Sequence, residues 1–262
     1  MRVSEWIDLA VFTFLTALAW KRRLPDRKRW IVTAFGMAAI ATTLAGARWG
    51  SEIVRDWLPA PLLLMVYWQA GHFFTGANER IQERLLALDR RVVTPVVAWL
   101  AKSGAGRALL TAVEFAYLFC YSMVPVAMGA VYLLHARAQA DRFWTIVLIA
   151  TYACYLMVPF IQTLPPRSLA GAARTAPPRT GVRSFNLWIL KHASIQMNTF
   201  PSAHVAASMA CALAILKISG PGGPGFLVLA IGIALGAVYG RYHYAADAIL
   251  GAAIAGVVAV AW

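Results

Sequence analysis

The sequence predicts an all-α fold, a multi-pass bundle of membrane-spanning helices. Of its 262 residues, 60% are hydrophobic and 13% are charged, which is too apolar for an ordinary soluble domain of this length. A helix needs about 20 largely apolar residues to cross a bilayer. Apolar stretches near that length recur at Trp6–Trp20, Trp30–Ala47, Leu58–Thr75, Ala108–His135, Phe143–Leu164, Ala203–Ser219, Phe226–Gly240 and Tyr244–Trp262.

Residues 1–57 are expected to form N-terminal membrane helices joined by a basic loop. The first apolar stretch lacks the basic start and the small-residue cleavage site of a signal peptide, so we interpret it as an anchor helix. The loop Lys21–Arg29 is strongly basic and marks a cytoplasmic connection by the positive-inside rule. Because the first and seventh stretches are short, the sequence predicts roughly six to eight spanning helices.

Residues 58–262 are expected to form a second membrane domain that contains two polar segments. Segment 78–104 mixes charged residues with Ile81, Leu85 and Leu88 at helical spacing, which predicts an amphipathic helix at the membrane interface. The connector 165–202 carries basic residues and no acid. Because so long a connector is seldom without structure, we expect Ser184–Ile195 to form an interfacial helix that covers a site.

The charge and cysteine content narrow the classes of partner. The formal net charge is +13, but much of the basic charge lies between apolar stretches, so anionic lipid headgroups are favoured over nucleic acid. Cys120, Cys154 and Cys211 fall within apolar stretches, where they are expected to pack as small hydrophobes. Their spacing indicates neither a disulfide framework nor a metal site.

A histidine and a carboxylate near the C-terminus are the strongest chemical signal. After Asp141, Asp247 is the one remaining acidic residue, and it follows His243 by four positions. On a helix the two would share a face, so the carboxylate could accept a hydrogen bond from the imidazole. That bond would make His243 a nucleophile or a general base. The plainer alternative is an ion pair that only stabilises a helix end.

Two further segments carry groups suited to an anion. Pro201-Ser202 before an apolar stretch is typical of a helix start, where Ser202 can cap and the backbone N–H groups from Ala203 onward favour phosphate. His204 then lies beside the bound anion, although a lone histidine is equally typical of a membrane interface. Arg167 and Arg241 suit phosphate oxygens, and headgroup contact is the alternative for each.

A polar stripe is predicted in the stretch Ala108–His135. Glu114, Tyr117 and Tyr121 lie at helical spacing and could face the site. Because acids within membrane helices are costly, Glu114 is expected to have a buried partner, such as an arginine or histidine of the site, or to be a satisfied structural carboxylate.

In these motifs the chain resembles the type 2 phosphatidic acid phosphatase superfamily of membrane lipid phosphatases and phosphotransferases. In particular it resembles the branch that includes fungal inositol phosphorylceramide synthase, in which Pro-Ser-x-His and His-Tyr-x-x-Asp blocks stand in this order; the resemblance covers roughly Ala108–Trp262. It implies a six-helix core with extra helices before it. It also implies that His243 attacks phosphorus, Asp247 orients it and His204 protonates the departing oxygen. The groups that hold the phosphoryl oxygens would be Arg167, Ser202, Ala203 and Arg241.

The chain departs from the usual phosphatase blocks at two positions. Phe160 stands where a lysine is usual, and Ala237 stands where an arginine is usual. Arg241 is a displaced substitute for that arginine, and Lys191 is a candidate replacement for the lysine.

The resemblance implies a phospholipid or isoprenoid-phosphate substrate in the bilayer, an alcohol acceptor if the enzyme is a transferase, and neither a cofactor nor a metal. Three alternatives stay open. His204, His243 and Asp247 could hold a metal in a membrane hydrolase, although two nearby arginines favour an anion. The same groups could form a proton relay in a transporter. Counting spans from the basic loop predicts a cytoplasmic site, whereas the resemblance implies the outer or lumenal face.

Overall fold

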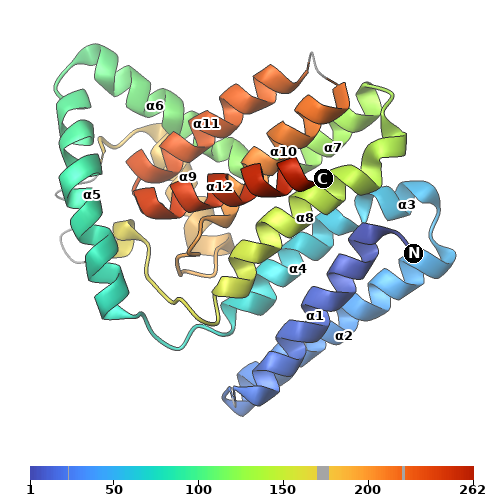
Figure 1. Cartoon of the computed structure of the whole chain (residues 1–262). Coiled ribbons are helices and arrows are strands. Elements are labelled where there is room, and N and C mark those ends of the chain that lie inside the picture. The colour runs from blue at the N-terminus through green and yellow to red at the C-terminus, as the bar shows by residue number, and fades with distance from the viewer. Residues whose placement is uncertain (23, 170–176, 220–221) are drawn as a thin grey trace.

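The protein is a bundle of α-helices (Figure 1), seen in a computed structural model that describes residues 1–22, 24–169, 177–219 and 222–262. Those residues contain no β-strand, which confirms the predicted all-α class. The helices are α1 (Val3–Lys21), α2 (Asp26–Trp49), α3 (Glu52–Trp57), α4 (Pro59–Gly71), α5 (Glu79–Leu100), α6 (Gly104–Leu118), α7 (Met123–Leu133), α8 (Ala140–Met157), α9 (Gly181–Ala193), α10 (Ala203–Ser219), α11 (Gly223–Tyr239) and α12 (Ala245–Ala261).

Helices α8 and α10 form the centre of the bundle (Figure 1). Helix α8 packs against α1, α4, α10 and α12, and α10 packs against α7, α11 and α12 as well. Small residues at helical spacing allow the close approach of α10 and α12. Ala206 and Ala210 on α10, and Gly251 and Ala255 on α12, are all buried.

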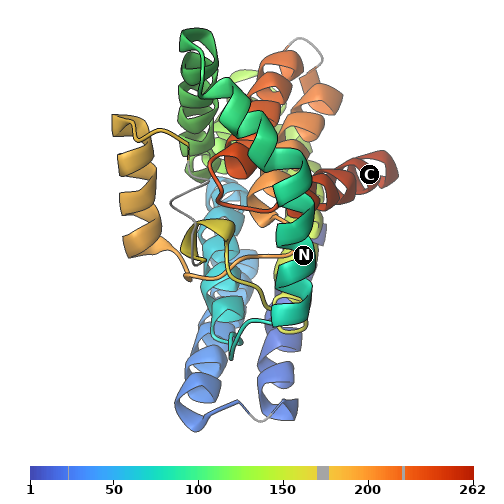
Figure 2. The same ribbon diagram turned by 90° about the vertical axis from the view of Figure 1, so that its left-hand side faces the viewer.

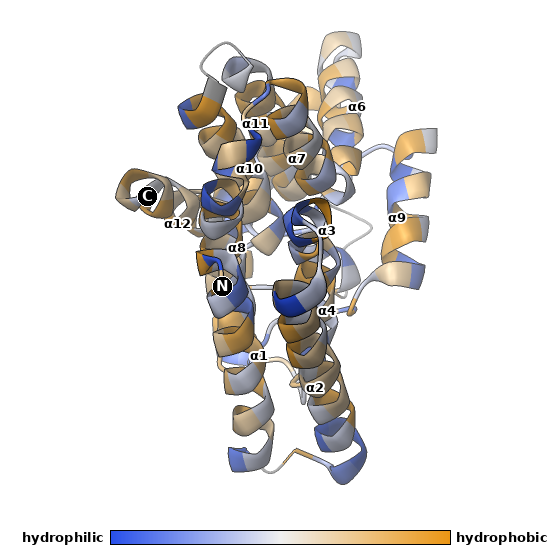
Figure 3. Cartoon of the chain, turned by 90° about the vertical axis from the view of Figure 1, so that its right-hand side faces the viewer, coloured by the Kyte–Doolittle hydropathy of each residue, from blue (hydrophilic) through white to orange (hydrophobic). Residues whose placement is uncertain are grey.

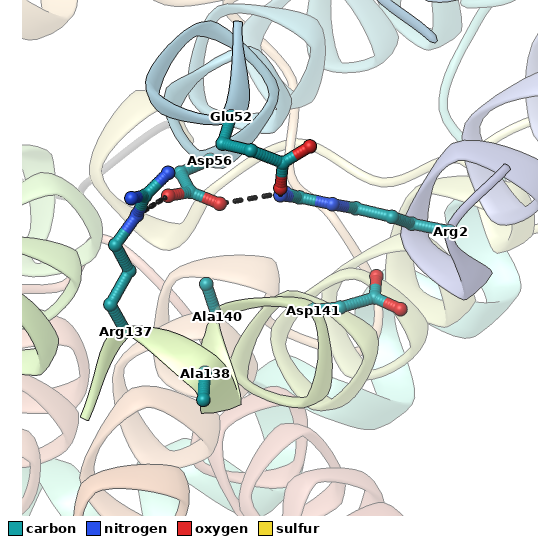
Figure 4. Close-up of a pocket in the computed structure, with 7 residues that line it drawn as sticks. All are labelled: Arg2, Glu52, Asp56, Arg137, Ala138, Ala140 and Asp141. Atoms are coloured by element: carbon teal, nitrogen blue, oxygen red, sulfur yellow. Dashed lines mark hydrogen bonds and ion pairs between the residues drawn. The ribbon is translucent and has the colours of Figure 1, made fainter.

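Helices α1 and α2 form a hairpin at one side of the bundle, where it packs against α4 and α8 (Figures 1 and 2). Along its length α1 packs on α8, where the Tyr152 hydroxyl donates a 2.6 Å hydrogen bond to buried Asp8. A polar cluster holds the end of the hairpin that lies near the N-terminus. This cluster surrounds a pocket of about 360 Å³ (Figure 4). There, Asp56 accepts 2.7 Å bonds from both Arg2 and Arg137. This cluster joins the hairpin to the start of α8.

Two described helices, α1 and α2, are long and apolar enough to cross a membrane. Figure 3 shows hydrophilic residues gathered at the ends of this hairpin and more apolar residues between them. Helices α10, α11 and α12 are apolar but shorter, with 17 residues each and therefore a rise of about 25 Å. The apolar helices indicate a membrane protein, while the expected count of six to eight crossings stays a prediction.

The expected single helix over Ala108–His135 is wrong, because the chain bends there by 72°. Helix α6 ends at Leu118, a 3₁₀ turn covers Phe119–Tyr121, and α7 begins at Met123. Pro125 explains the break, since it has no N–H to bond a carbonyl one turn earlier but is tolerated in the first turn of a new helix. The bend leaves Tyr121 beside the start of α10, with its ring centroid 6.1 Å from that of His204.

Helices α5 and α9 flank the bundle, and Figure 2 shows α9 standing to one side of it. Helix α5 is amphipathic over most of the predicted segment 78–104. Helix α9 (Gly181–Ala193) corresponds to the helix expected at Ser184–Ile195 in the connector 165–202, and residues 170–176 of that connector lie outside the described part of the chain. Helix α9 packs against α6.

We predict that Gly251→Ala destabilises the protein by about 1–3 kcal/mol, because its Cβ would lie 2.5 Å from the backbone oxygen of Ser202. Gly256 on the same helix has open space at its Cβ position and is the matched control. Gly256→Ala should be neutral or slightly stabilising, because alanine favours helix more than glycine does. Thermal unfolding of both variants in detergent tests this, and equal shifts would contradict the packing explanation.

Candidate active site

Three segments that are distant in the sequence meet at one end of α10. They are the chain after α8 near Arg167, the chain that enters α10 at Ser202, and the turn between α11 and α12. Backbone hydrogen bonds join them: Asn198 N–H donates to the Thr163 carbonyl (2.9 Å), Ser202 N–H to the Asp247 carbonyl (3.0 Å), and Arg167 N–H to the Arg241 carbonyl (3.0 Å). The predicted motifs therefore lie in one place.

The two histidines face each other across this junction. His204 Nδ1 and His243 Nε2 lie 3.2 Å apart, at hydrogen-bonding distance, and the tautomers decide which nitrogen donates. His243 is 5% exposed, whereas His204 is half-buried. Burial, together with the positive charge of Arg167, lowers the pKa of His243 to about 3. His243 is therefore a neutral imidazole near pH 7, with an unprotonated nitrogen available.

Asp247 lies close to His243, but the two residues do not share one face of a helix as we expected, because α12 begins after His243. His243 stands in the turn before α12, and its Nδ1 is 3.5 Å from Asp247 Oδ2, a contact that makes no hydrogen bond and becomes an ion pair only when the imidazole carries a positive charge. The reason is that the carboxylate folds back as a helix cap and accepts the Tyr244 N–H (3.0 Å). Its shortest bond, 2.7 Å, comes from the side-chain amide of Asn198.

The predicted phosphate-binding groups differ in how they are engaged. The Arg167 side chain is partly exposed and donates to the Tyr242 carbonyl at 3.3 Å. Ser202 is fully buried, and its Oγ accepts the Val205 N–H (3.4 Å), while the Ala203 N–H donates to a threonine hydroxyl (3.3 Å). The structure does not bring the Arg241 side chain to the histidines, because its guanidinium pairs with Asp89 at 3.3 Å.

Glu114 has the buried arginine partner that the sequence led us to expect, and it is Arg183 of α9. Their side chains lie 3.2 Å apart, both almost fully buried. Glu114 also accepts bonds from Asn186 (2.9 Å) and from the Tyr242 hydroxyl, and Arg183 donates to the Gly240 carbonyl (3.0 Å). Sequence analysis did not identify Arg183 and Asn186 as the partners of Glu114, because a polar residue in a connector carries no signal of burial.

The remaining predicted residues divide between this network and the surface. Tyr117 is buried and stacks on Tyr242 with ring centroids 4.2 Å apart, and its centroid is 6.1 Å from that of His204. Tyr121, at the end of the 3₁₀ turn that follows α6, lies at the same centroid distance from His204. Lys191 is exposed on α9, so its role in phosphate binding stays a prediction.

An apolar cavity of about 550 Å³ leads to His204. Its walls come from α4, the bend between α6 and α7, Tyr155 of α8, the end of α9 and the first turns of α10. Leu190 of α9 lies on one side and Ala207, one turn beyond His204, lies on another. A half-buried histidine thus stands where an apolar space meets a charged site.

Comparison with known families places the chain in one superfamily. A family model described as the PAP2 superfamily matches residues 83–261, which include every predicted catalytic residue. The chain belongs to this superfamily, that of the type 2 phosphatidic acid phosphatases, and membership supports a phosphatase-type activity on phosphorylated substrates. Comparisons with curated proteins and with solved structures gave no match. The particular branch stays a prediction.

We predict that Arg183→Met destabilises the protein by about 3–5 kcal/mol, because it leaves the Glu114 carboxylate buried without its cation. The Glu114→Gln/Arg183→Met double variant should lose less than the sum of the single losses, since it leaves no unpaired charge. Arg179→Met, at an exposed position before the same helix, is the control and should change little. Denaturant unfolding of the wild type, Glu114→Gln, Arg183→Met and the double variant measures the coupling, and strictly additive losses would show that the two side chains do not stabilise each other.

Proposed function

We propose that this protein is a membrane lipid-phosphate enzyme that cleaves or transfers a phosphoryl group, or a phospho-headgroup, through a phosphohistidine intermediate. The observation that carries the proposal is the pair His204 and His243, 3.2 Å apart, at the end of an apolar cavity and beside Arg167. An imidazole, a cation and an apolar channel match the nucleophile, the anion and the hydrocarbon chain of such a reaction.

In the proposed first step, Nε2 of His243 attacks phosphorus. A nitrogen–phosphorus bond forms as the bond from phosphorus to the leaving oxygen breaks. In its protonated form, His204 is placed to give that oxygen a proton and become neutral, because its Nδ1 lies next to Nε2 of His243, where the substrate would take the place of the present hydrogen bond. Asp247 stabilises the positive charge that develops on the ring of His243. Arg167 attracts the phosphoryl oxygens.

In the second step, an oxygen nucleophile releases the histidine. Water or an alcohol loses its proton to His204, its oxygen bonds to phosphorus, and the nitrogen–phosphorus bond breaks. With water the product is free phosphate or a phosphorylated headgroup, and with an alcohol it is a new phosphate ester. Inorganic phosphate measured against phospholipid product, from one defined donor with candidate alcohols present, separates the hydrolase from the transferase.

The cavity supports a substrate with a long apolar chain. Residues of α4, α7 and α9 line it, so a chain could lie against Leu190 and Ala207 while the phosphate reaches His204. A free sugar phosphate or nucleotide would leave this apolar wall in contact with water, which is unfavourable. We therefore infer a phospholipid or isoprenoid phosphate as the substrate. We also propose that the protein crosses the membrane several times and, if it is bacterial, lies in the plasma or inner membrane.

The metal-dependent alternative needs a set of ligands. In the parts of the chain that the structure describes, no three His, Cys, Asp or Glu side chains are grouped to hold a metal ion. The transporter alternative uses the same residues as the enzyme. It differs from the enzyme in that a proton relay forms no covalent bond to phosphorus.

We predict that brief incubation with a radiolabelled lipid phosphate leaves acid-labile label on the wild type and none on His243→Ala, because the variant lacks the attacking nitrogen. Phosphate release should fall by at least about 10³-fold. Each protein is labelled in detergent, and the reaction is quenched at alkaline pH, where phosphohistidine survives. Labelling of both proteins would exclude His243 as the nucleophile.

The same assay distinguishes the metal-dependent alternative from the proposed mechanism. We expect labelling and turnover to survive EDTA, and complete loss in EDTA that zinc or iron restores would overturn the proposed mechanism.

We predict that Ala207→Phe raises KM for long-chain lipid phosphates about 10-fold or more, because the ring would fill the cavity beside His204. For a short, water-soluble phosphate ester the change should stay below about 2-fold, since that substrate does not use the cavity. Ala253→Phe, on the exposed face of α12, is the matched control. Equal effects on both substrates would show that the cavity does not hold the chain.

A further inference from the structure

Asp89 of α5 contacts the turn that carries His243. Although α5 is a peripheral amphipathic helix, this side chain is fully buried. Its Oδ1 accepts the backbone N–H of Ala245 at 3.0 Å, and its Oδ2 lies 3.3 Å from the Arg241 guanidinium. Arg241 and Ala245 stand two residues before and two residues after His243. One carboxylate therefore connects both sides of the histidine.

The turn needs such a connection for two physical reasons. Arg241 has a φ of 64°, in the left-handed region that a residue with a side chain adopts only where its surroundings hold it. Its guanidinium is also buried, and a buried cation without a partner is strongly unfavourable. At the other side, Ala245 is the first residue of α12, so its N–H has no acceptor within the helix. Asp89 satisfies both requirements.

We propose that Asp89 is a positioning residue for His243: it holds Arg241 and Ala245 at a fixed separation and thereby aims the imidazole at the phosphoryl site. This inference rests on the proposed function. Asp89 itself lies behind the turn and bonds to Arg241 and Ala245, so it acts through them. Helix α5 thereby supports the catalytic site through a residue that lies outside the three motif segments.

The test compares Asp89→Asn and Asp89→Ala with Glu83→Gln, a matched control in which an exposed acid of the same helix loses its charge. With a short, soluble phosphate ester, Asp89→Asn should lower kcat about 10-fold, because the amide oxygen can still accept the Ala245 N–H but no longer neutralises Arg241. Asp89→Ala, which loses both contacts, should lower kcat about 100-fold. In both variants KM should change less than about 2-fold, because the substrate-binding groups remain.

A double variant, Asp89→Ala/Arg241→Gly, distinguishes positioning from general instability. Glycine adopts the left-handed backbone without strain and removes the buried cation. The double variant should therefore be more active than Asp89→Ala alone, although it has lost more contacts.

Hydrogen exchange gives a readout that does not depend on activity. In Asp89→Ala, a peptide spanning residues 240–246 should exchange faster than in the wild type, while peptides from α1 and α2 should not change. Unchanged exchange of the 240–246 peptide, or unchanged kcat in both Asp89 variants of an active protein, would overturn the inference. A wild type that neither forms the labelled intermediate nor releases phosphate, yet shows the exchange difference, would instead overturn the proposed function.

Discussion

The location of His243 depends on carboxylates buried around the turn that joins α11 to α12. Asp247 accepts the N–H of Tyr244, and Asp89 accepts that of Ala245. Glu114 holds Arg183, which in turn donates to the Gly240 carbonyl. A buried carboxylate is tolerated only where donors surround it, so each acid fixes the part of the turn that supplies its donors. Because the acids come from α5, α6 and α12, the histidine cannot move without breaking contacts to several helices.

This arrangement also separates two environments within a short distance. His204 lies at the end of the apolar cavity, while His243 lies behind it among charged and hydrogen-bonded groups. A lipid phosphate has the same division, with hydrocarbon on one side and an anion on the other. In the proposed reaction the half-buried histidine handles the leaving oxygen, which is the atom that joins these two parts. In the same proposed reaction the more buried histidine would form the covalent bond, where water is largely excluded.

The helical class and the three motif segments of the site could both be predicted from the sequence, because both follow from local patterns. Apolar stretches define helices, and Pro-Ser before such a stretch defines a helix start. The supporting residues were not predictable in this way. Asp89 resembles any charge on an amphipathic helix, yet its partner Arg241 lies 152 positions away in the sequence. Asn198 and Arg183 likewise meet Asp247 and Glu114 through tertiary packing. The bend after α6 did have a local signal, Pro125, which the length of the apolar stretch outweighed.

The departures from the family's blocks reduce the positive charge beside His243. Ala237 is fully buried, and its carbonyl accepts the N–H groups of both Tyr242 and His243, so this position shapes the turn and contributes no cation. The displaced Arg241 is neutralised by Asp89. Within the described residues, Arg167 is then the arginine near His243 that has no carboxylate partner. A phosphomonoester carries a charge of about −2 near pH 7, whereas a phosphodiester carries a single negative charge. One unpaired arginine balances the diester more closely, and within the proposed function this favours a phosphodiester over a phosphomonoester as the substrate.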